Sequence, residues 1–569
     1  GGASVLASQE FDEAAENKRP AVQVGDPFEE KLLIEVCLEL LKAGRFVALG
    51  DLGAAGLTSS ASEMASRGGV GIDIDVCKVP QREEAMQAFE IMVSESQERM
   101  LAVVTPEDWP AVEEACSRWG VAASRIGSIT DTGRFVVRDS SLPTGQQIVA
   151  DMPAEMLAES APEYDPESRR PAYLDEVQGF DALAFIEERE REQRTASSLD
   201  NAGSLDSVQD RDNAQDRSPV DYTHDLLTLL ASPNICSRAW IWRQYDHQVQ
   251  NNTVLLPGAD AAVLRIGDTG RGEMSTRGIA ISTDCNGRYC YLDPYRGAQL
   301  ALAEGMRNLA CTGAEPLALT DCLNFGNPEK PEVFYTFKQA VSGLADACKH
   351  YTIPVISGNV SFYNESFGTA IYPTSTIGIV GVLEDVSVAL DAAFKQSGDV
   401  IILVGETLSE LGGSEYLKLR YDKVAGAPPL LDLDLEAAVQ AAVRTCVQAR
   451  LLASAHDLSE GGLAVALAES CLAGELGASV VLDSEVAPVA ALFAESASRI
   501  LISADPEQVE PVLEVLLSHQ VPYSVIGDVG GSTLAIDTVY EAEQKSAIEV
   551  PLCALASTYN DTLESLVKQ

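Results

Sequence analysis

The feature that most constrains the fold is a pattern that occurs twice, about 400 residues apart. The first copy reads GDLGAAGLTSSASEMA at 50–65, and the second reads HDLSEGGLAVALAESC at 456–471. Each has Asp-Leu, then small residues, then Gly-Leu, and a Glu six positions after that Leu. Internal repetition of this kind indicates one structural unit used twice in the chain.

The similarity continues beyond these two stretches. Downstream, ESQERMLAVVTPEDWPAVEEAC at 95–116 parallels ESASRILISADPEQVEPVLEVL at 495–516. The copies then continue alike, with SRIGSITDTGRFVV in the first and YSVIGDVGGSTLAI in the second. We therefore predict one lobe present twice, at 1–140 and again at 401–569.

Helical and extended patterns alternate within the first lobe. Residues 29–44 have the apolar spacing of a helix, and 45–50 form a short apolar run typical of a strand. Residues 57–69 again predict a helix that ends on glycine, and 70–76 alternate as a strand. The expected fold class is α/β (α+β), with helices that cover a sheet.

The rest of the chain divides by composition. Residues 230–400 are rich in strand and turn signals and form a different lobe, N-terminal to the second copy. Between the halves, 141–229 is predicted to be a linker. Its stretch 186–219 is charged and rich in Ser, Asn and Gln, with too few apolar side chains to offset the entropy of ordering. We therefore expect a disordered acidic insert there.

The first lobe has no counterpart of 230–400 within the chain. In the second copy Asp260 precedes Gly412 by 152 residues, since 412 − 260 = 152. Internal symmetry therefore leads us to expect at least that much sequence before Gly1. The expected architecture is a pseudo-dimer of duplicated two-lobe domains in which the N-terminal half of the first copy is missing.

Composition narrows the classes of partner. The formal net charge of −46 disfavours binding to nucleic acid, whose phosphates would be repelled. No apolar run reaches the roughly 18 residues that a membrane helix needs. The twelve cysteines are scattered without a CxxC pair, which indicates a reducing cytoplasm and argues against structural zinc.

Three strand ends carry polar residues suited to a metal–phosphate site. Asp51 ends a predicted strand and precedes a Gly-rich turn into a helix, where a carboxylate, close backbone approach and a helix N-terminus favour such a ligand. The alternative for Asp51 is a simple helix cap. Gly358 and Asn359 follow a strand in ISGNVS, and Asp321 ends a strand in TDCLNFGNPEKPE; the alternative there is a plain turn. No Walker A loop or Ser-His-Asp arrangement is present.

Several longer motifs occur together: AVQVGDPF, GDLGAAGLTSSASEM, SESQERM, YDHQVQNNTV, STDCNGRY, LTDCLNFGNPEKPE and ISGNVSFYNE. With these, the chain closely resembles the small form of formylglycinamide ribonucleotide amidotransferase. That family is also called phosphoribosylformylglycinamidine synthase, small PurL type, and belongs to the PurM/PurL-like superfamily. The resemblance covers both lobes and the intervening domain, outside the insert at 186–219.

The resemblance implies a cytoplasmic ligase of purine biosynthesis. Such an enzyme uses ATP and Mg²⁺ to activate the formamide oxygen of formylglycinamide ribonucleotide, and ammonia then displaces phosphate to give the amidine. The chain shows no glutaminase pattern, so the resemblance implies that ammonia comes from glutamine through partner subunits, the glutaminase PurQ and the small subunit PurS.

Carried over position by position, the resemblance also implies the site residues. They are, for the nucleotide substrate, Gln23, Glu95, Ser96, Gln97 and Ser361; for ATP, Asp321 and Gly358; and for Mg²⁺, Asp51 and Asn359. The family's catalytic histidines belong to the part expected before Gly1, so no catalytic residue is assigned and this chain alone is expected to be inactive. His247 is interpreted as structural.

Two other interpretations stay open. The chain could be another ATP-dependent member of the superfamily, such as a kinase or selenophosphate synthetase, although those lack the combination of ESQ and LNFGNPEKPE. It could also be a nucleotide-binding fragment without turnover. Between the two copies, Ala497 stands where the first has Gln97. An alanine offers no amide to a ligand, so we interpret the first copy as the working one and the second as a structural or auxiliary-nucleotide copy.

Overall fold

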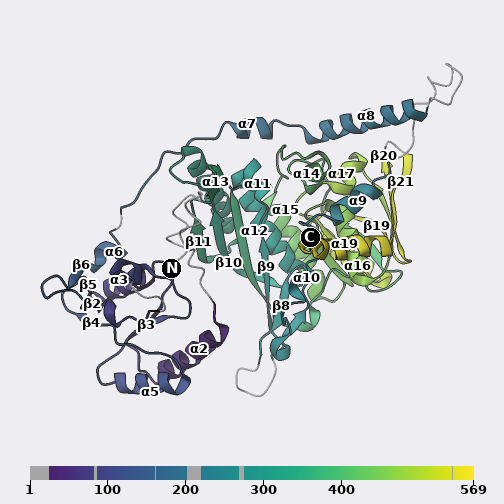
Figure 1. The fold of residues 1–569 in the computed structure, drawn as a ribbon. Helices are drawn as coiled ribbons and strands as arrows, with labels where there is room; N and C mark the ends of the chain where they lie inside the picture. Colours follow the sequence, from purple (N-terminus) through teal and green to yellow (C-terminus); the bar gives the residue numbers. More distant parts are fainter. Residues whose placement is uncertain are drawn as a thin grey trace. The chain divides into compact units, whose positions relative to one another are not determined.

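The computed structural model describes residues 25–81, 86–160, 162–201, 220–267, 275–540 and 543–568. The chain divides into two compact units (Figure 1). The first unit comprises Gly1–Pro166 with Phe362–Ala370, and the second comprises Glu167–Ser361 with Ile371–Gln569.

The first unit begins with a helix pair and a short two-stranded ladder. Helix α2 (Pro27–Lys42) starts at Asp26, whose carboxylate accepts a hydrogen bond from the N–H of Glu29. It packs against α5 (Trp109–Trp119) through a small apolar cluster that includes Val36 and Val112. Strand β1 (Ala48–Asp51) pairs antiparallel with β3 (Met100–Val103).

A four-stranded sheet in the order β4-β2-β5-β6 completes the first unit. Its strands are β2 (Gly71–Asp75), β4 (Gly127–Thr130), β5 (Arg134–Arg138) and β6 (Ile148–Pro153). The remaining helices are α3 (Gly56–Gly68), η2 (Val76–Lys78), α4 (Ala88–Val93) and α6 (Ala154–Ala158), and the hairpin β12 (Glu365–Ser366) and β13 (Thr369–Ala370) also belongs to this unit. Buried Leu57, Ile74, Ile91 and Phe135 form the core between α3, α4 and the sheet.

The sheet of the first unit includes a strand beyond residue 140, the predicted end of the first lobe. Strand β6 pairs with β5 from Arg134 opposite Pro153 to Arg138 opposite Ile148, so it completes the sheet of this lobe. Ala154, at the start of α6, is buried in the same core. Strand β6 is mostly exposed and lacks the apolar alternation that marks a half-buried strand, so local sequence patterns do not indicate it.

The second unit contains a seven-stranded sheet in the order β16-β18-β15-β19-β17-β20-β21. Its strands are β15 (Val400–Val404), β16 (Ser454–Asp457), β17 (Ala478–Asp483), β18 (Ile500–Ala504), β19 (Tyr523–Val529), β20 (Thr533–Tyr540) and β21 (Glu543–Pro551). The helices of this part are α14 (Glu415–Tyr421), α15 (Leu433–Gln448), α16 (Gly462–Gly474), α17 (Pro488–Phe493), η6 (Pro506–Gln508), α18 (Val509–Ser518) and α19 (Leu552–Val567). Apolar residues fill both sides of this sheet, in two separate core clusters.

A six-stranded sheet, in the order β11-β10-β14-β9-β8-β7, forms the other half of the second unit. Its strands are β7 (Thr253–Leu255), β8 (Ala262–Arg265), β9 (Gly278–Asp284), β10 (Glu315–Asn324), β11 (Val355–Ser361) and β14 (Thr374–Leu383). The helices here are α10 (Ala239–Trp242), η4 (Val249–Asn251), α11 (Gly287–Leu292), α12 (Pro294–Cys311), α13 (Pro331–Tyr351) and η5 (Val386–Val388). Helix α12 packs against β9, β14, α13 and α15, which leaves it buried on nearly every side (Figure 1).

Part of the predicted insert at 186–219 is a helix. Within the predicted linker, α7 (Tyr173–Gln178) is followed by α8 (Ala182–Asn201) and then by α9 (Thr223–Leu230). Ile186 of α8 is fully buried in the main core cluster, and Glu190 accepts a hydrogen bond from the hydroxyl of Tyr222 at 3.0 Å. These contacts anchor the N-terminal half of α8 despite its high charge, whereas residues 202–219 lie outside the described residues.

The expected fold class and the duplication are both confirmed. In each copy a strand that ends in Asp leads into a helix: β1 into α3 in the first and β16 into α16 in the second. In each copy that strand pairs antiparallel with a later one, β3 or β18.

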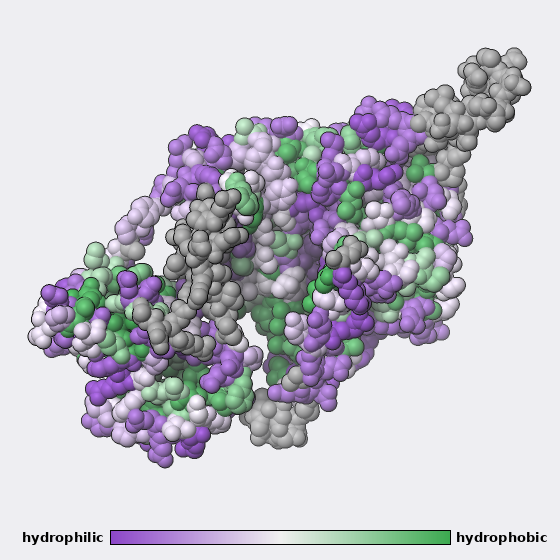
Figure 2. All heavy atoms as spheres, viewed as in Figure 1, coloured by the Kyte–Doolittle hydropathy of each residue, from purple (hydrophilic) through white to green (hydrophobic). Residues whose placement is uncertain are grey.

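Hydrophilic residues cover much of the molecular surface shown in Figure 2, in keeping with the large negative net charge. Of the helices that the structure describes, none combines the length and the apolar character needed to cross a membrane.

Candidate functional site

The loop that follows β1 brings Asp51 to the surface beside the N-terminus of α3. Asp51 ends β1 and is exposed, and Ala55 and Gly56 both adopt left-handed backbone angles, with φ of 58° and 55°. A Cβ at Gly56 would lie only 2.0 Å from the carbonyl oxygen of Ser94. Glycine is therefore required there, because the segment after α4 passes directly against the first turn of α3.

Glu95, predicted to contact substrate, supports this loop through its side chain. Its Oε1 accepts a hydrogen bond from the backbone N–H of Ala55 at 3.0 Å, and the residue is only 6% exposed. The hydroxyl of Thr58 donates to the carbonyl of Met92 at 3.0 Å and ties α3 to α4. Gln97, two residues after Glu95, is exposed. The predicted residues Glu95, Ser96 and Gln97 thus share one turn. Within it the carboxylate of Glu95 is turned inward.

The second copy repeats this geometry residue by residue. Glu495 Oε1 accepts from the N–H of Gly461 at 2.8 Å, as Glu95 does from Ala55. A Cβ at Gly462 would lie 2.4 Å from the carbonyl oxygen of Ala494, which matches the contact of Gly56 with Ser94. The internal repeat is therefore a repeat of loop structure as well as of sequence.

A small cavity lies beside the loop of the second copy. Its lining combines Leu458, Ser459, Glu460, Glu495 and Ala497 with residues of α11, α12 and the turn before α11, namely Asn286, Tyr289, Leu300, Glu304 and Arg307. Ala497 thus lines this cavity at the position that Gln97 occupies in the first copy.

Asp457, the counterpart of Asp51, is buried and faces an arginine. One of its carboxylate oxygens lies 3.7 Å from the guanidinium of Arg307, which also donates to both oxygens of Glu436 at 3.0 Å. Burial opposes the charge of Arg307, but Glu436 and Asp457 outweigh it and raise the pKa of the guanidinium. Burial raises the pKa of Asp457 to about 7, despite the nearby guanidinium.

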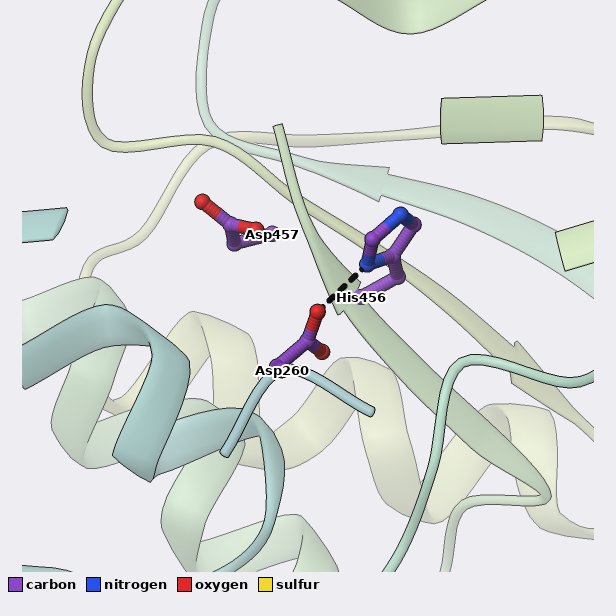
Figure 3. Close-up of side chains that lie close together, drawn as sticks. All are labelled: Asp260, His456 and Asp457. Atoms are coloured by element: carbon purple, nitrogen blue, oxygen red, sulfur yellow. Dashed lines mark hydrogen bonds and ion pairs between the residues drawn. The ribbon is translucent and has the colours of Figure 1, made fainter. Parts of the chain in front are cut away.

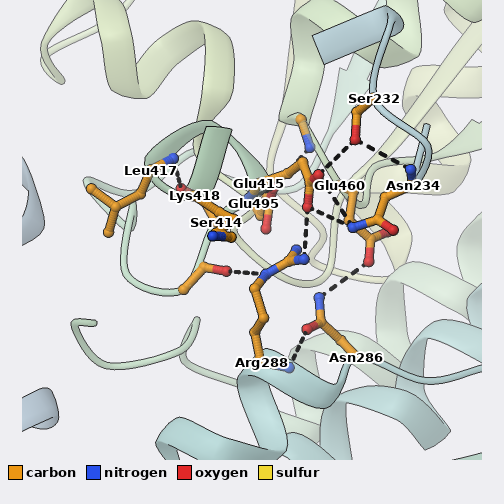
Figure 4. A network of polar contacts seen from close by, with 12 residues as sticks. Ser232, Asn234, Asn286, Arg288, Ser414, Glu415, Leu417, Lys418, Glu460 and Glu495 are labelled. Atoms are coloured by element: carbon orange, nitrogen blue, oxygen red, sulfur yellow. Dashed lines mark hydrogen bonds and ion pairs between the residues drawn. The ribbon is translucent and has the colours of Figure 1, made fainter. Parts of the chain in front are cut away.

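A network of polar side chains, in which Glu415 is buried, includes the cavity-lining residues Asn286, Glu460 and Glu495 (Figure 4). Arg288 forms an ion pair with Glu415 at 2.7 Å, and the amide of Asn234 donates to both oxygens of Glu415. Asn286 donates to Glu460 at 3.1 Å. The network joins α11 to the loop before α10 and to α14, so it fixes the cavity walls from three directions.

Three potential metal ligands, Asp260, His456 and Asp457, lie close together in this part of the second unit (Figure 3). The Nδ1 of His456 lies 2.6 Å from Asp260, and its Nε2 lies 3.2 Å from Glu469. Burial disfavours the charged ring, yet the two carboxylates outweigh it and hold the pKa of His456 well above its usual value. Both ring nitrogens of His456 are therefore engaged by carboxylates within the protein.

A second group of predicted residues lies on the adjacent parallel strands β10 and β11. In the strand register Asp321 is opposite Gly358, Cys322 is opposite Asn359, and Asn324 is opposite Ser361. A Cβ at Gly358 would lie 2.5 Å from Asp321 Oδ1, so glycine allows this carboxylate to rest against the backbone of β11.

Asp321 and Asn359 point to opposite faces of this sheet, because side chains alternate along a strand. Asp321 lies two residues from each of the buried Leu319 and Leu323, so it is on the same face of the sheet as these two, the face toward the helices. Burial raises the pKa of the Cys348 thiol, on α13, to about 11, and the nearby charge of Asp321 acts in the same direction. Asn359 is exposed and donates from Nδ2 to Ser361 Oγ at 3.3 Å.

The structure thus gathers the predicted residues into two groups. Asp51 and the turn Glu95–Gln97 form one group in the first unit, and the β10–β11 residues form the other in the second unit. Gln23 lies outside the described residues. Sequence reasoning missed the buried charges of α12, although Glu304 and Arg307 interrupt the otherwise apolar run GAQLALAEGMRNLAC and gave a usable signal.

Comparisons with known proteins agree with the internal repeat. The family model for the AIR synthase related protein C-terminal domain matches twice, at residues 1–140 and 396–537. The model for the AIR synthase related protein N-terminal domain matches residues 258–383.

Solved structures show the same fold. The Thermotoga maritima PurL complexed with FGAR is 24% identical, with a TM-score of 0.61, and the match covers 90% of this chain and 66% of that one. The structure of PurLQS from the same organism has a TM-score of 0.60 and 24% identity, over 91% of this chain and 69% of that one.

Full-length relatives are closer in sequence. The phosphoribosylformylglycinamidine synthase subunit PurL of Moorella thermoacetica is 49% identical over 533 residues, which are 94% of this chain and 67% of the relative. The protein of the same name from Caldanaerobacter subterraneus is 46% identical over 565 residues, or 99% of this chain and 70% of the relative. The chain therefore belongs to the family of phosphoribosylformylglycinamidine synthase subunit PurL.

Proposed function

We propose that the chain serves in the ATP-dependent conversion of formylglycinamide ribonucleotide and ammonia to formylglycinamidine ribonucleotide, a ligase reaction of purine biosynthesis. The observation that carries the proposal is the identity of 46–49% to PurL subunits over nearly the whole chain. The Thermotoga relatives, which share the fold, were solved with FGAR and with ATP. The phosphoryl group of ATP is transferred to the oxygen of the glycinamide carbonyl and ADP is released. Ammonia then attacks the carbon of that carbonyl, and phosphate leaves with loss of a proton to give the amidine.

The residues present suit a magnesium ion. Nδ2 of Asn359 is hydrogen-bonded to Ser361 and to the sulfur of Cys322, at 3.3 and 3.7 Å, which turns the amide so that Oδ1 is the atom presented to a ligand. Asp51 offers an exposed carboxylate. Carboxylate and amide oxygens are ligands that Mg²⁺ accepts, and the bound ion would neutralise charge on the phosphate oxygens. We assign Asp51 and Asn359 this role.

We assign the substrate ribonucleotide to Ser361 and to the turn that carries Ser96 and Gln97, together with Gln23. Glu95 acts within that turn by holding Ala55. Asp321 and Gly358 are assigned to ATP, where the absence of a side chain at Gly358 leaves backbone accessible to a phosphate. Each assignment follows the family resemblance; Asp321, Gly358 and Ser361 lie on the adjacent parallel strands β10 and β11.

We propose a structural role for the second copy. Asp457 is only 5% exposed, and the arginine of α12 already supplies a positive charge beside it. Ala497 provides no amide at the position of Gln97. These features favour a lobe that stabilises the fold over one that binds an auxiliary nucleotide.

The proposed partners are a glutaminase subunit, PurQ, and a small subunit, PurS, that together supply ammonia. The likeness of the fold to the PurL chain of the Thermotoga maritima PurLQS structure supports an assembly of several subunits. All twelve cysteines are free thiols, which supports a reducing, cytoplasmic location.

The test is titration calorimetry of the full chain with formylglycinamide ribonucleotide in the presence of Mg²⁺ and a non-hydrolysable ATP analogue. Saturable binding that Gln97→Ala weakens by about tenfold is expected, the value of one lost hydrogen bond to a charged or polar ligand. Equal binding of ribose 5-phosphate would contradict the substrate assignment. An assay with ATP and ammonia, followed by mass detection of the amidine, then separates an active ligase from a binding fragment.

A further inference from the structure

Arg99 closes the turn that carries Glu95, Ser96 and Gln97. Its Nε donates to the carbonyl oxygen of Ser96 at 3.2 Å, and its terminal nitrogen donates to the carbonyl oxygen of Ser94. One planar guanidinium therefore bridges the two ends of the turn. Both acceptors are backbone atoms, so the contact fixes the path of the main chain.

The turn needs such support because its backbone is strained. Glu98 adopts a left-handed conformation with φ of 56°, which is unfavourable for a residue with a side chain. Its Oε1 accepts a hydrogen bond from the N–H of Asp26 at 3.0 Å. A strained residue of this kind persists only where surrounding contacts hold it, and Arg99 is next to it in sequence.

The second copy contains the same device. Arg499 Nε donates to the carbonyl of Ser496 at 3.0 Å, and its terminal nitrogen donates to the carbonyl of Ala494 at 2.5 Å. Ser498, the counterpart of Glu98, has φ of 59°. The repetition shows that the arginine clamp is part of the loop's architecture and does not depend on the residue that follows Ser96 or Ser496.

The two arginines differ in their surroundings. Arg499 is fully buried and also donates to Thr407 at 2.9 Å. Arg99 is only half-buried, and in the part of the chain that the structure describes it forms no ion pair with a carboxylate. Burial lowers the pKa of Arg99, but a guanidinium remains charged at neutral pH. The first clamp therefore lies close to the surface, next to exposed Gln97.

We propose that Arg99 is a positioning residue for substrate binding: by bridging the carbonyls of Ser94 and Ser96 it holds the turn in the shape that presents Gln97. This inference rests on the proposed function, which assigns Gln97 to the ribonucleotide substrate. Arg99 itself is not required to touch the substrate.

Three variants of the full chain test it. Arg99→Met keeps the apolar stem and removes the clamp. Arg99→Lys keeps the charge but replaces the planar fork by a single nitrogen, and Arg499→Met removes the matched clamp of the second copy. Amide hydrogen exchange over residues 94–98 and at Ala55 reports the order of the turn. Titration calorimetry then gives the affinities for formylglycinamide ribonucleotide and, separately, for an ATP analogue.

We expect both Arg99 variants to increase exchange in the turn at least about tenfold and to weaken substrate binding similarly, with the affinity for the ATP analogue unchanged. Arg499→Met should lower thermal stability and leave the substrate affinity as it is. Unchanged exchange in Arg99→Met overturns the clamp whatever the substrate is. Increased exchange with unchanged substrate affinity overturns the positioning role, and a wild-type chain that binds no ribonucleotide counts against the proposed function alone.

Full substrate affinity in Arg99→Lys, with exchange still raised, would show that the positive charge is what matters and would also overturn positioning. An equal loss of affinity in Arg499→Met would mean that general destabilisation explains the effect, and it too would overturn the proposal.

Discussion

The carboxylate of Asp457 lies 3.7 Å from the guanidinium of Arg307, at the end of β16. Its counterpart in the first copy, Asp51, ends β1 in the same way but is exposed. The same strand-end aspartate is therefore built into a buried charge cluster in one lobe and presented to solvent in the other. This difference separates a residue that serves folding from one available to a ligand.

The two aspartates should respond differently to the same substitution. Asp51→Ala should abolish binding of the Mg²⁺–ATP analogue with little change in thermal stability, because an exposed side chain makes few contacts. Asp457→Ala should lower the free energy of unfolding by about 2–4 kcal/mol, because it leaves a buried arginine partly unpaired. Urea denaturation and calorimetric titration measure the two quantities. Equal loss of nucleotide binding in both variants, without a stability change, would contradict this division.

Arg307 should be among the most sensitive positions for folding. Arg307→Met leaves Glu436 and Asp457 buried without their cation, and removing one partner from such a group costs about 3–5 kcal/mol. Arg277→Met is the matched control: Arg277 pairs with Glu384 at the surface, where solvent screens the pair, and its loss should cost far less. Chemical denaturation of both variants measures the difference in unfolding free energy. Similar small losses in both would show that Glu436 and Asp457 do not need a buried cation.

Stability should fall as the pH rises from about 4 to 7. Burial raises the pKa of Asp457 and that of Asp284 to about 7, well above the value of about 3.9 in an unfolded chain. In this window the folded state binds more protons than the unfolded state, so this contribution to stability is complete at low pH and is lost as the pH rises through the folded pKa. Asp457→Asn should flatten the profile of unfolding free energy against pH. The exposed Asp51→Asn is the control, and an unchanged slope in Asp457→Asn would refute the assignment.

Gly358→Ala should impair ATP binding. The new methyl group would lie 2.5 Å from Asp321 Oδ1, and this short carboxylate cannot move away without leaving its place against β11. We expect the affinity for an ATP analogue to fall at least about tenfold, equivalent to about 1.4 kcal/mol. Gly25→Ala, which meets no atom within 4 Å, is the control. Wild-type affinity in Gly358→Ala would remove Asp321 and Gly358 from the nucleotide site.

Much of the fold could be predicted because periodicity is a local property of the sequence. The predicted helix at 29–44 and strand at 70–76 correspond to α2 and β2 within two residues at each end. The insert was harder, because charge density suggested disorder while two buried residues, Ile186 and Glu190, anchor the N-terminal half of α8. Two long-range contacts of this kind leave almost no trace in local composition.

The residues of the candidate site come from the family resemblance, which does not give their contacts. The resemblance assigned Glu95 and Gln97, and the structure adds that Glu95 turns inward to Ala55, 40 residues earlier in the chain. The opposite facing of Asp321 and Asn359 follows from strand alternation once the strand is known. The arginine of the clamp is present in both copies, in ESQER and ESASR. Its contacts depend on the positions of backbone carbonyls, which the sequence does not give.

The repeated clamp also bears on how the two lobes could diverge after duplication. The contacts that shape the turn use glycine, a glutamate, an arginine and the main chain, and none of them uses the position held by Gln97 or Ala497. A change of side chain at that position therefore leaves the contacts that shape the loop intact. The two lobes can present different side chains there, Gln97 in one and Ala497 in the other, on the same backbone.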